Sequence, residues 1–189
     1  KMSGFLRYKK ILDLFSEERS SWTVLEIAKA LETPSSTIYR IIREMVSAEF
    51  LESAAGSYFR LGPAFIKFNR IINFSDPLVR AGQPFLKKLA DENPITSVNV
   101  LARLYGKKVM CVADYKSPSF KKNTSYQRGK LMPLIYGATS RAIIMQITNR
   151  KLQDLIDLEN FKSDEDKNNF LKDLKNDRKK GYCFTEGQV

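Results

Sequence analysis

The residues best suited to a chemical task lie in one short stretch, residues 34–43, with the sequence PSSTIYRIIR. Apolar residues at the helical spacing i, i+3, i+4, i+7 predict a helix with one buried face there: Ile38, Ile41, Ile42 and Met45. Hydroxyl and guanidinium groups are left on the other faces, from Ser36, Thr37, Tyr39, Arg40 and Arg43. In a DNA major groove, a guanidinium can donate two hydrogen bonds to guanine, and hydroxyls can bind phosphates. The stretch predicts a DNA recognition helix, although an ordinary surface helix with two arginines is the alternative.

Two more amphipathic helices must position this one, and the same apolar spacing predicts them over 8–15 and 24–31. After the third helix, strand-like residues 50–53 and 57–61 flank Ala54-Ala55-Gly56, which predicts a hairpin. Three helices followed by a hairpin is the order of a winged helix-turn-helix domain. We therefore expect a DNA-binding domain over residues 1–62.

The hairpin would be the wing, and its polar residues are candidate contacts to the DNA backbone or minor groove. These candidates are Ser57, Tyr58 and Arg60. The alternative for the aromatic residues is that Tyr58 and Phe59 only pack within the hairpin.

Residues 63–76 read as a connecting helix that ends at the Asp76-Pro77 boundary. Its apolar residues exceed what a free connecting helix needs: Phe65, Phe68, Ile71 and Ile72. We therefore expect a homodimer, which would match a palindromic operator. Packing of these residues within their own chain is the alternative.

Residues 77–189 mix helix and strand patterns, so the expected fold class of the whole chain is α+β. Helices are predicted over 78–93, with Pro84 distorting the middle, and over 138–147, 151–158 and 164–180. Strands are predicted over 96–104, 109–115 and 182–185, and the basic stretch 116–130 reads as a solvated loop and strand.

A turn of small residues in this half is a candidate effector site: Gly137, Ala138, Thr139 and Ser140. Small residues let a ligand approach the backbone, and free N–H groups in a first helical turn can bind a carboxylate. With Leu134 as an apolar wall, the site would suit a small organic acid or aromatic acid. The alternative is that Thr139 or Ser140 only caps its helix.

Composition narrows the function classes. The formal net charge of +11 favours an anionic partner, although most of the surplus lies beyond residue 75 and does not itself place the DNA site. The absence of histidine removes Ser-His-Asp and Cys-His catalysis, and Cys111 and Cys183 fit no zinc or disulfide framework. No apolar run approaches the roughly 20 residues of a membrane span. We expect a cytoplasmic protein that is not an enzyme, with no cofactor, metal ion or membrane partner.

The chain resembles the IclR family of bacterial transcription regulators. The family's Ser-Thr-hydrophobic-aromatic-Arg recognition helix is similar to residues 36–40, and its Tyr-hydrophobic-Leu-Gly wing end is similar to residues 58–62. Motifs of the family's effector domain are similar to residues 129, 133–134, 138–142, 178 and 181–182. Two positions differ from the family pattern: Ser140 stands where Gly is usual, and Arg141 stands where Lys is usual. The resemblance implies a GAF-like α/β effector domain over 77–189 and dimers that can pair into tetramers.

Family effector domains continue past the Gly-Tyr pattern into further strands, whereas this chain ends at Val189, with Gln188 where the family often has Glu. We therefore expect an effector domain that is truncated at its C-terminal end, either because that part is absent from the chain or because the protein is a shortened relative.

The leading hypothesis is a sequence-specific transcription regulator, a repressor, that a small-molecule effector controls. An RNA- or ribosome-associated winged helix protein is one alternative, since the same basic surface would bind any phosphate backbone. A redox sensor or enzyme built on a cysteine thiol is the other.

Overall fold

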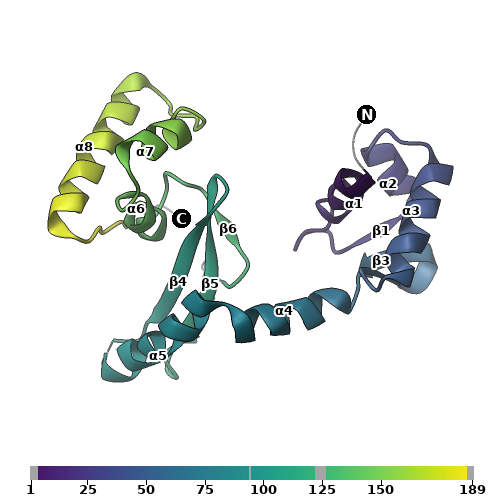
Figure 1. Ribbon diagram of the computed structural model, residues 1–189, viewed down its shortest axis with the longest axis horizontal. Helices are drawn as coiled ribbons and strands as arrows, with labels where there is room; N and C mark the ends of the chain where they lie inside the picture. Colours follow the sequence, from purple (N-terminus) through teal and green to yellow (C-terminus); the bar gives the residue numbers. More distant parts are fainter. Residues whose placement is uncertain (1–3, 94, 122–126, 187–189) are drawn as a thin grey trace. The chain divides into compact units, whose positions relative to one another are not determined.

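The computed structural model describes residues 4–93, 95–121 and 127–186, so Gln188 and Val189 lie outside the described residues. The chain divides into two compact units, and the division falls between Ser75 and Asp76 (Figure 1). The first unit contains the predicted recognition helix and the second contains a sheet with longer strands. The expected α+β class is confirmed.

The three N-terminal helices form where the apolar spacing predicts them: α1 (Gly4–Leu12), α2 (Val24–Ala30) and α3 (Ser35–Ser47). Each helix contributes its apolar stripe to one core, which includes Ile11, Ile27, Ile38 and Ile42, all at most 1% exposed. Burial of this shared stripe fixes which face of α3 remains outside.

A three-stranded antiparallel sheet completes the first unit, in the order β1 (Ser21–Thr23), β3 (Tyr58–Leu61), β2 (Leu51–Ser53). The hairpin β2–β3 is the predicted wing, and a short 3-10 turn, η1 (Ala55–Ser57), joins its strands. Strand β1 was not predicted from the sequence; it pairs Trp22 with Phe59 and so connects the wing to the segment before α2.

Gly62 lies where the chain leaves the wing and enters α4 (Ala64–Ser75). Its N–H donates to the Phe50 carbonyl at 2.9 Å, and the N–H of Ala64 donates to the Glu49 carbonyl at 3.1 Å. A Cβ atom at position 62 would lie 2.3 Å from the Glu49 carbonyl oxygen, closer than nonbonded atoms can approach. The absence of a side chain therefore lets two backbone segments meet here.

Helix α4 is only partly covered. Near its start, the Phe65 ring packs edge-on against Phe50, with ring centroids 5.6 Å apart, and the Phe68 ring lies 6.0 Å from Phe50. Of the residues of α4, only Ala64 is buried, and four large apolar side chains are at least half exposed: Ile66, Ile71, Ile72 and Phe74. Packing within the first unit thus accounts for Phe65 and Phe68 but not for these four.

The second unit begins with α5 (Pro77–Glu92), which Asp76 caps by accepting a hydrogen bond from the N–H of Leu78 at 2.9 Å. The helix continues through Pro84 without interruption. It packs on a sheet in the order β4 (Val98–Tyr105), β5 (Lys108–Lys116), β6 (Leu131–Met132), where β4 and β5 form the predicted hairpin (Figure 1).

Three helices follow: α6 (Ala138–Ile144), α7 (Asn149–Ile156) and α8 (Asp164–Lys180). Their apolar residues form one core with the sheet, and Val109 of β5, Ile144 of α6 and Ile156 of α7 are fully buried in it. Helix α5 instead covers the Ala113 end of β5, in a smaller core with Val79 and Leu86. The sheet therefore carries two cores, one at each end of β5.

One predicted strand is wrong. Gly181, at φ 78°, ends α8 as expected, but Tyr182–Thr185 lies in no strand. Its aromatic and β-branched residues have the composition of a strand, yet a strand also needs a neighbour to complete its hydrogen bonds, and these residues pair with none of the described strands. Instead, the Cys183 thiol contacts the Ala138 carbonyl at 3.1 Å.

Candidate nucleic-acid interface and effector site

The predicted recognition face is on the surface of α3. Ile38, Ile41, Ile42 and Met45 are at most 3% exposed, as their spacing requires. The predicted DNA-contacting residues all lie off this stripe: Ser36, Tyr39, Arg40 and Arg43 are exposed and Thr37 is half-buried. The side chain of Tyr39 is 55% exposed, so its hydroxyl and ring are accessible on this face.

These residues border an open hollow of about 520 Å³ along α3, and its lining residues are Tyr39, Arg40, Arg43, Glu44, Ser47 and Ala48. Two guanidinium groups and one phenol therefore converge on one concave surface, together with a single carboxylate. A surface of this composition can donate hydrogen bonds to phosphates and to base edges.

The carboxylate is Glu44, which the sequence analysis did not select. Its Oε1 accepts from Nη1 of Arg40 at 3.2 Å, and its Oε2 accepts a hydrogen bond from the Tyr8 hydroxyl of α1. That hydrogen bond to a carboxylate raises the pKa of Tyr8. The i,i+4 spacing of Arg40 and Glu44 was readable in the sequence, whereas the contribution of Tyr8 was not.

The wing places its candidate residues outward. Tyr58 and Arg60 are exposed on β3, while Phe59 between them packs against the core of the first unit. The two aromatic residues thus differ: Phe59 packs against the core, whereas Tyr58 is 38% exposed and its ring lies beside the turn of the hairpin at Gly56. Arg60 Nε donates to Oε1 of Glu52 at 2.6 Å on the neighbouring strand, and Ser57 is exposed at the turn.

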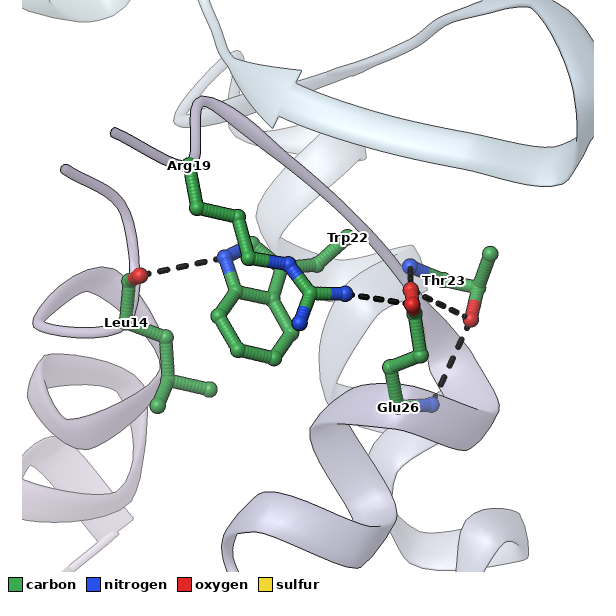
Figure 2. A network of polar contacts seen from close by, with 5 residues as sticks. All are labelled: Leu14, Arg19, Trp22, Thr23 and Glu26. Atoms are coloured by element: carbon green, nitrogen blue, oxygen red, sulfur yellow. Dashed lines mark hydrogen bonds and ion pairs between the residues drawn. The ribbon is translucent and has the colours of Figure 1, made fainter. Parts of the chain in front are cut away.

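A polar network fixes the start of α2, the helix that precedes the recognition helix (Figure 2). The Thr23 hydroxyl accepts from the N–H of Glu26 at 3.3 Å, and the Glu26 carboxylate accepts from the N–H of Thr23 at 2.8 Å, which is a capping box. Arg19 pairs with the same carboxylate and lies 3.4 Å above the Trp22 ring. Trp22 donates to the Leu14 carbonyl at 3.0 Å. The backbone hydrogen bond from Thr23 is the largest cause that lowers the pKa of Glu26.

The predicted effector residues lie together at the start of α6, but several have structural partners. Leu134 is fully buried in the core of the second unit, and Gly137 is buried at the N-cap position of α6. The Ser140 hydroxyl is 1% exposed and donates to the Pro133 carbonyl at 2.7 Å. Ala138 and Thr139 are half-buried, and no side chain caps α6. The groups of this turn that could bind a ligand are its backbone N–H groups and the Thr139 hydroxyl.

A separate hollow of about 320 Å³ lies on the same unit, and its lining includes Tyr136, Arg141, Phe161, Lys162 and Phe170. None of the five predicted effector residues lines it. Within the part of the chain that the structure describes, no group of three or more His, Cys, Asp or Glu side chains could hold a metal ion. Among the same residues, no helix is long and apolar enough to cross a membrane.

Residues 7–55 match the model of the IclR helix-turn-helix domain, so the match covers α2, α3 and the first strand of the wing. No curated protein matches the chain by sequence at a significant level.

Solved structures with a similar fold include proteins from three bacteria, two of which are described as IclR proteins. An IclR homologue of Microbacterium hydrocarbonoxydans, in complex with 4-hydroxybenzoate, has a TM-score of 0.76 and 18% identity over 96% of this chain and 76% of that one. An IclR family transcriptional regulator of Brucella abortus has a TM-score of 0.75 and 16% identity over 100% and 72%. HmgR of Pseudomonas aeruginosa has a TM-score of 0.74 and 17% identity over 98% and 75%. At such identities the likeness concerns the fold.

Proposed function

We propose that this chain, whose residues 7–55 match the IclR helix-turn-helix domain, is a transcription regulator of that family that binds a specific operator duplex as a homodimer and responds to a small-molecule effector. The observation that carries the proposal is the exposure of Tyr39, Arg40 and Arg43 on the face of α3 opposite its buried stripe. In a domain of this family, that face is available to DNA.

In the proposed complex, α3 lies in the major groove, where Arg40 and Arg43 read base edges. Ser36 and Thr37, at the N-terminal end of α3, bind backbone phosphates, because hydroxyls and the positive end of a helix both favour an anion. On the wing, Ser57, Tyr58 and Arg60 contact the adjacent backbone or minor groove. The exposure of Tyr58 and Arg60 supports this role.

The test is selection of a binding duplex from a random-sequence pool, followed by titration of variants against the selected duplex. If Arg40 is bidentate to a base, Arg40→Ala should weaken binding by about 1–3 kcal/mol and relax the sequence preference at one position. Arg80→Ala removes the same side chain from an exposed position of α5 and should leave the footprint unchanged. Equal effects of the two variants, or preferential capture of structured RNA over the duplex, would contradict the proposal.

The proposed homodimer uses the exposed apolar side of α4. Ile66, Ile71 and Phe74 are 51–83% exposed, and burial in a second copy would remove this area from water. A dimer would also present two copies of α3 to two half-sites, which one winged helix cannot do. Pairing of dimers into tetramers is a further step of the same proposal.

The proposed effector is a small organic acid, aromatic acids included, held by the first turn of α6. The half-buried Thr139 and the uncapped N–H groups of this turn support the proposal, with Gly137, Ala138 and Ser140 shaping the backbone and Leu134 supporting it from the core. The structure from M. hydrocarbonoxydans contains 4-hydroxybenzoate, so that compound is the first to test.

Calorimetry with 4-hydroxybenzoate and a panel of short organic acids tests the effector site. Thr139→Val replaces the hydroxyl with a methyl group of similar size, so binding at this turn should weaken. Thr148→Val makes the same change at the N-cap of α7, where the hydroxyl accepts no capping hydrogen bond, and serves as the control. Unchanged binding in Thr139→Val would place the effector elsewhere on the unit.

Repression is the proposed sign of regulation, with the bound dimer occluding a promoter in the cytoplasm and catalysing no reaction. A transcription reporter that carries the selected duplex between promoter and start site distinguishes repression from activation.

A further inference from the structure

An acidic residue on the recognition face needs a physical reason, because DNA is a polyanion. Glu44 is the one acidic residue of α3, and it lines the hollow that Arg40 and Arg43 also line. A carboxylate there repels phosphates and lowers the sequence-independent part of the affinity. Glu44 therefore weakens binding to every duplex. Its benefit would have to be a larger difference in affinity between the operator and other sequences.

The geometry around Glu44 is specific. Each of its two carboxylate oxygens has a different partner: Oε1 accepts from Nη1 of Arg40 at 3.2 Å, and Oε2 accepts from the hydroxyl of Tyr8. Tyr8 belongs to α1 and is half-buried against the core of the first unit, whereas Arg40 is 68% exposed on α3. Tyr8 of α1 thus orients the Glu44 carboxylate, and that carboxylate in turn orients the Arg40 guanidinium.

An exposed i,i+4 ion pair on its own orders its side chains little, because the pairing gain is small beside the rotamer entropy lost. The hydrogen bond from Tyr8 changes this, since a partly buried aromatic side chain has few rotamers and fixes the carboxylate. The Arg40 guanidinium uses one of its five N–H donors on Glu44, so enough remain for two hydrogen bonds to a base.

We infer that Tyr8 and Glu44 are positioning residues that set operator specificity: they hold the Arg40 guanidinium over the base edges and keep it from the phosphates. The inference rests on the proposed function, since it assigns a task to two residues around Arg40. Without the carboxylate, the long arginine side chain would reach a backbone phosphate, which is present on every sequence.

The test compares affinity for the selected duplex with affinity for a scrambled duplex, each over a salt series. Glu44→Gln should tighten binding to the scrambled duplex and steepen its salt dependence by about one unit of slope, because one more phosphate is neutralised. The ratio of the two affinities should fall about tenfold, the size of one lost charge-assisted hydrogen bond. Tyr8→Phe, which removes only the hydroxyl, should lower the ratio in the same direction by a smaller factor.

The control is Glu49→Gln, which makes the same charge change at an exposed position just beyond α3. A shift as large as that of Glu44→Gln would show that general charge, and not the held geometry, is responsible. In an Arg40→Ala background, Tyr8→Phe should no longer change the ratio, whereas a purely structural role of Tyr8 would leave its effect intact. Trp22 fluorescence confirms that each variant is folded.

The same variants distinguish a wrong interface from a wrong positioning role. If Arg40→Ala leaves operator affinity unchanged, the proposed interface is wrong. If Arg40→Ala weakens binding but Glu44→Gln and Tyr8→Phe change neither the ratio nor the salt slope, the interface stands and the positioning inference is overturned.

Discussion

Asp177 of α8 accepts two hydrogen bonds from the guanidinium of Arg141 of α6, one from Nε at 2.9 Å and one from Nη2. Both side chains are almost wholly removed from solvent, at 10% and 12% exposed. The neighbouring Arg178 donates to the carbonyls of Met145 and Ile147 at 2.9 and 2.8 Å. Helix α8 therefore holds the turn between α6 and α7 through charged groups as well as through the apolar core.

Removal of one partner from this pair should strongly destabilise the second unit. Asp177→Ala leaves the Arg141 guanidinium buried without its counter-charge, and we expect a loss of about 3–5 kcal/mol. Urea denaturation followed by far-UV circular dichroism measures it. Glu92→Gln, in the exposed 3.7 Å pair with Lys88, is the control and should stay within about 0.5 kcal/mol of the wild type. Similar losses in both variants would contradict the prediction.

The stability of the first unit should depend on acid pH through Glu26. Its pKa is lowered from the usual 4.5, chiefly by the hydrogen bond from the Thr23 N–H, so the folded state favours the ionised form. The contribution is present above pH 4.5 and is lost as the pH falls through the lower folded value. Fluorescence of Trp22, the single tryptophan, reports this unit. Glu26→Gln should flatten the dependence, and Thr23→Ser, which keeps a capping hydroxyl, should retain it.

Neither cysteine should behave as a reactive thiol. Burial raises the pKa of Cys111 to about 11, with a smaller contribution from Asp114, and burial also raises the pKa of Cys183. The thiolate is the nucleophile, so at pH 7.5 both should react with a thiol reagent more slowly than free cysteine, and Cys111 only on unfolding. Cys183→Ala assigns the two rates. A rate above that of free cysteine would favour the redox alternative.

The apolar side of α4 should control association. Ile71→Asp places a charge among exposed apolar side chains that we propose to be buried in a dimer, so the dimer should dissociate at concentrations where the wild type remains dimeric. Gln83→Glu adds a negative charge at an exposed polar position of α5, outside the proposed interface, and should have little effect. Sedimentation velocity over a concentration series distinguishes them. A monomeric wild type at concentrations that saturate the operator would disprove the dimer.

The helices of the first unit were predictable because their signal is local. Ile38, Ile41, Ile42 and Met45 occupy one face at a fixed spacing, and all four are buried. The exposure of Tyr39 and Arg40 then follows from the same periodicity. The exposed side of α3, where we propose DNA binding, could therefore be selected without knowledge of any tertiary contact.

The strands were less predictable, because a strand depends on a partner that lies elsewhere in the sequence. Ser21–Thr23 has only three residues with two hydroxyls, yet it becomes β1 by pairing with Tyr58–Arg60. Tyr182–Thr185 has the more strand-like composition and lies in no strand. Composition indicated the opposite result in each case.

The candidate sites show the same difference between features set by local spacing and features set by tertiary contacts. The sequence indicates that Arg40 and Glu44 are close, since they lie one helical turn apart, but it cannot place Tyr8 beside them. Ser140 resembles a free hydroxyl in the sequence, whereas in the structure it donates to the Pro133 carbonyl. A side chain's availability to a ligand depends on partners that only the fold supplies.

Gly62 also constrains how sequences of this kind can diverge. Exposed positions of α3 and of the wing can exchange side chains at little cost to folding, and in the proposed complex such exchanges would change the operator. The junction between wing and α4 has no such freedom, because even one methyl group would collide with the Glu49 carbonyl oxygen. In a mutational library selected for folding, position 62 should therefore remain glycine while the proposed DNA-contacting positions of α3 and the wing vary.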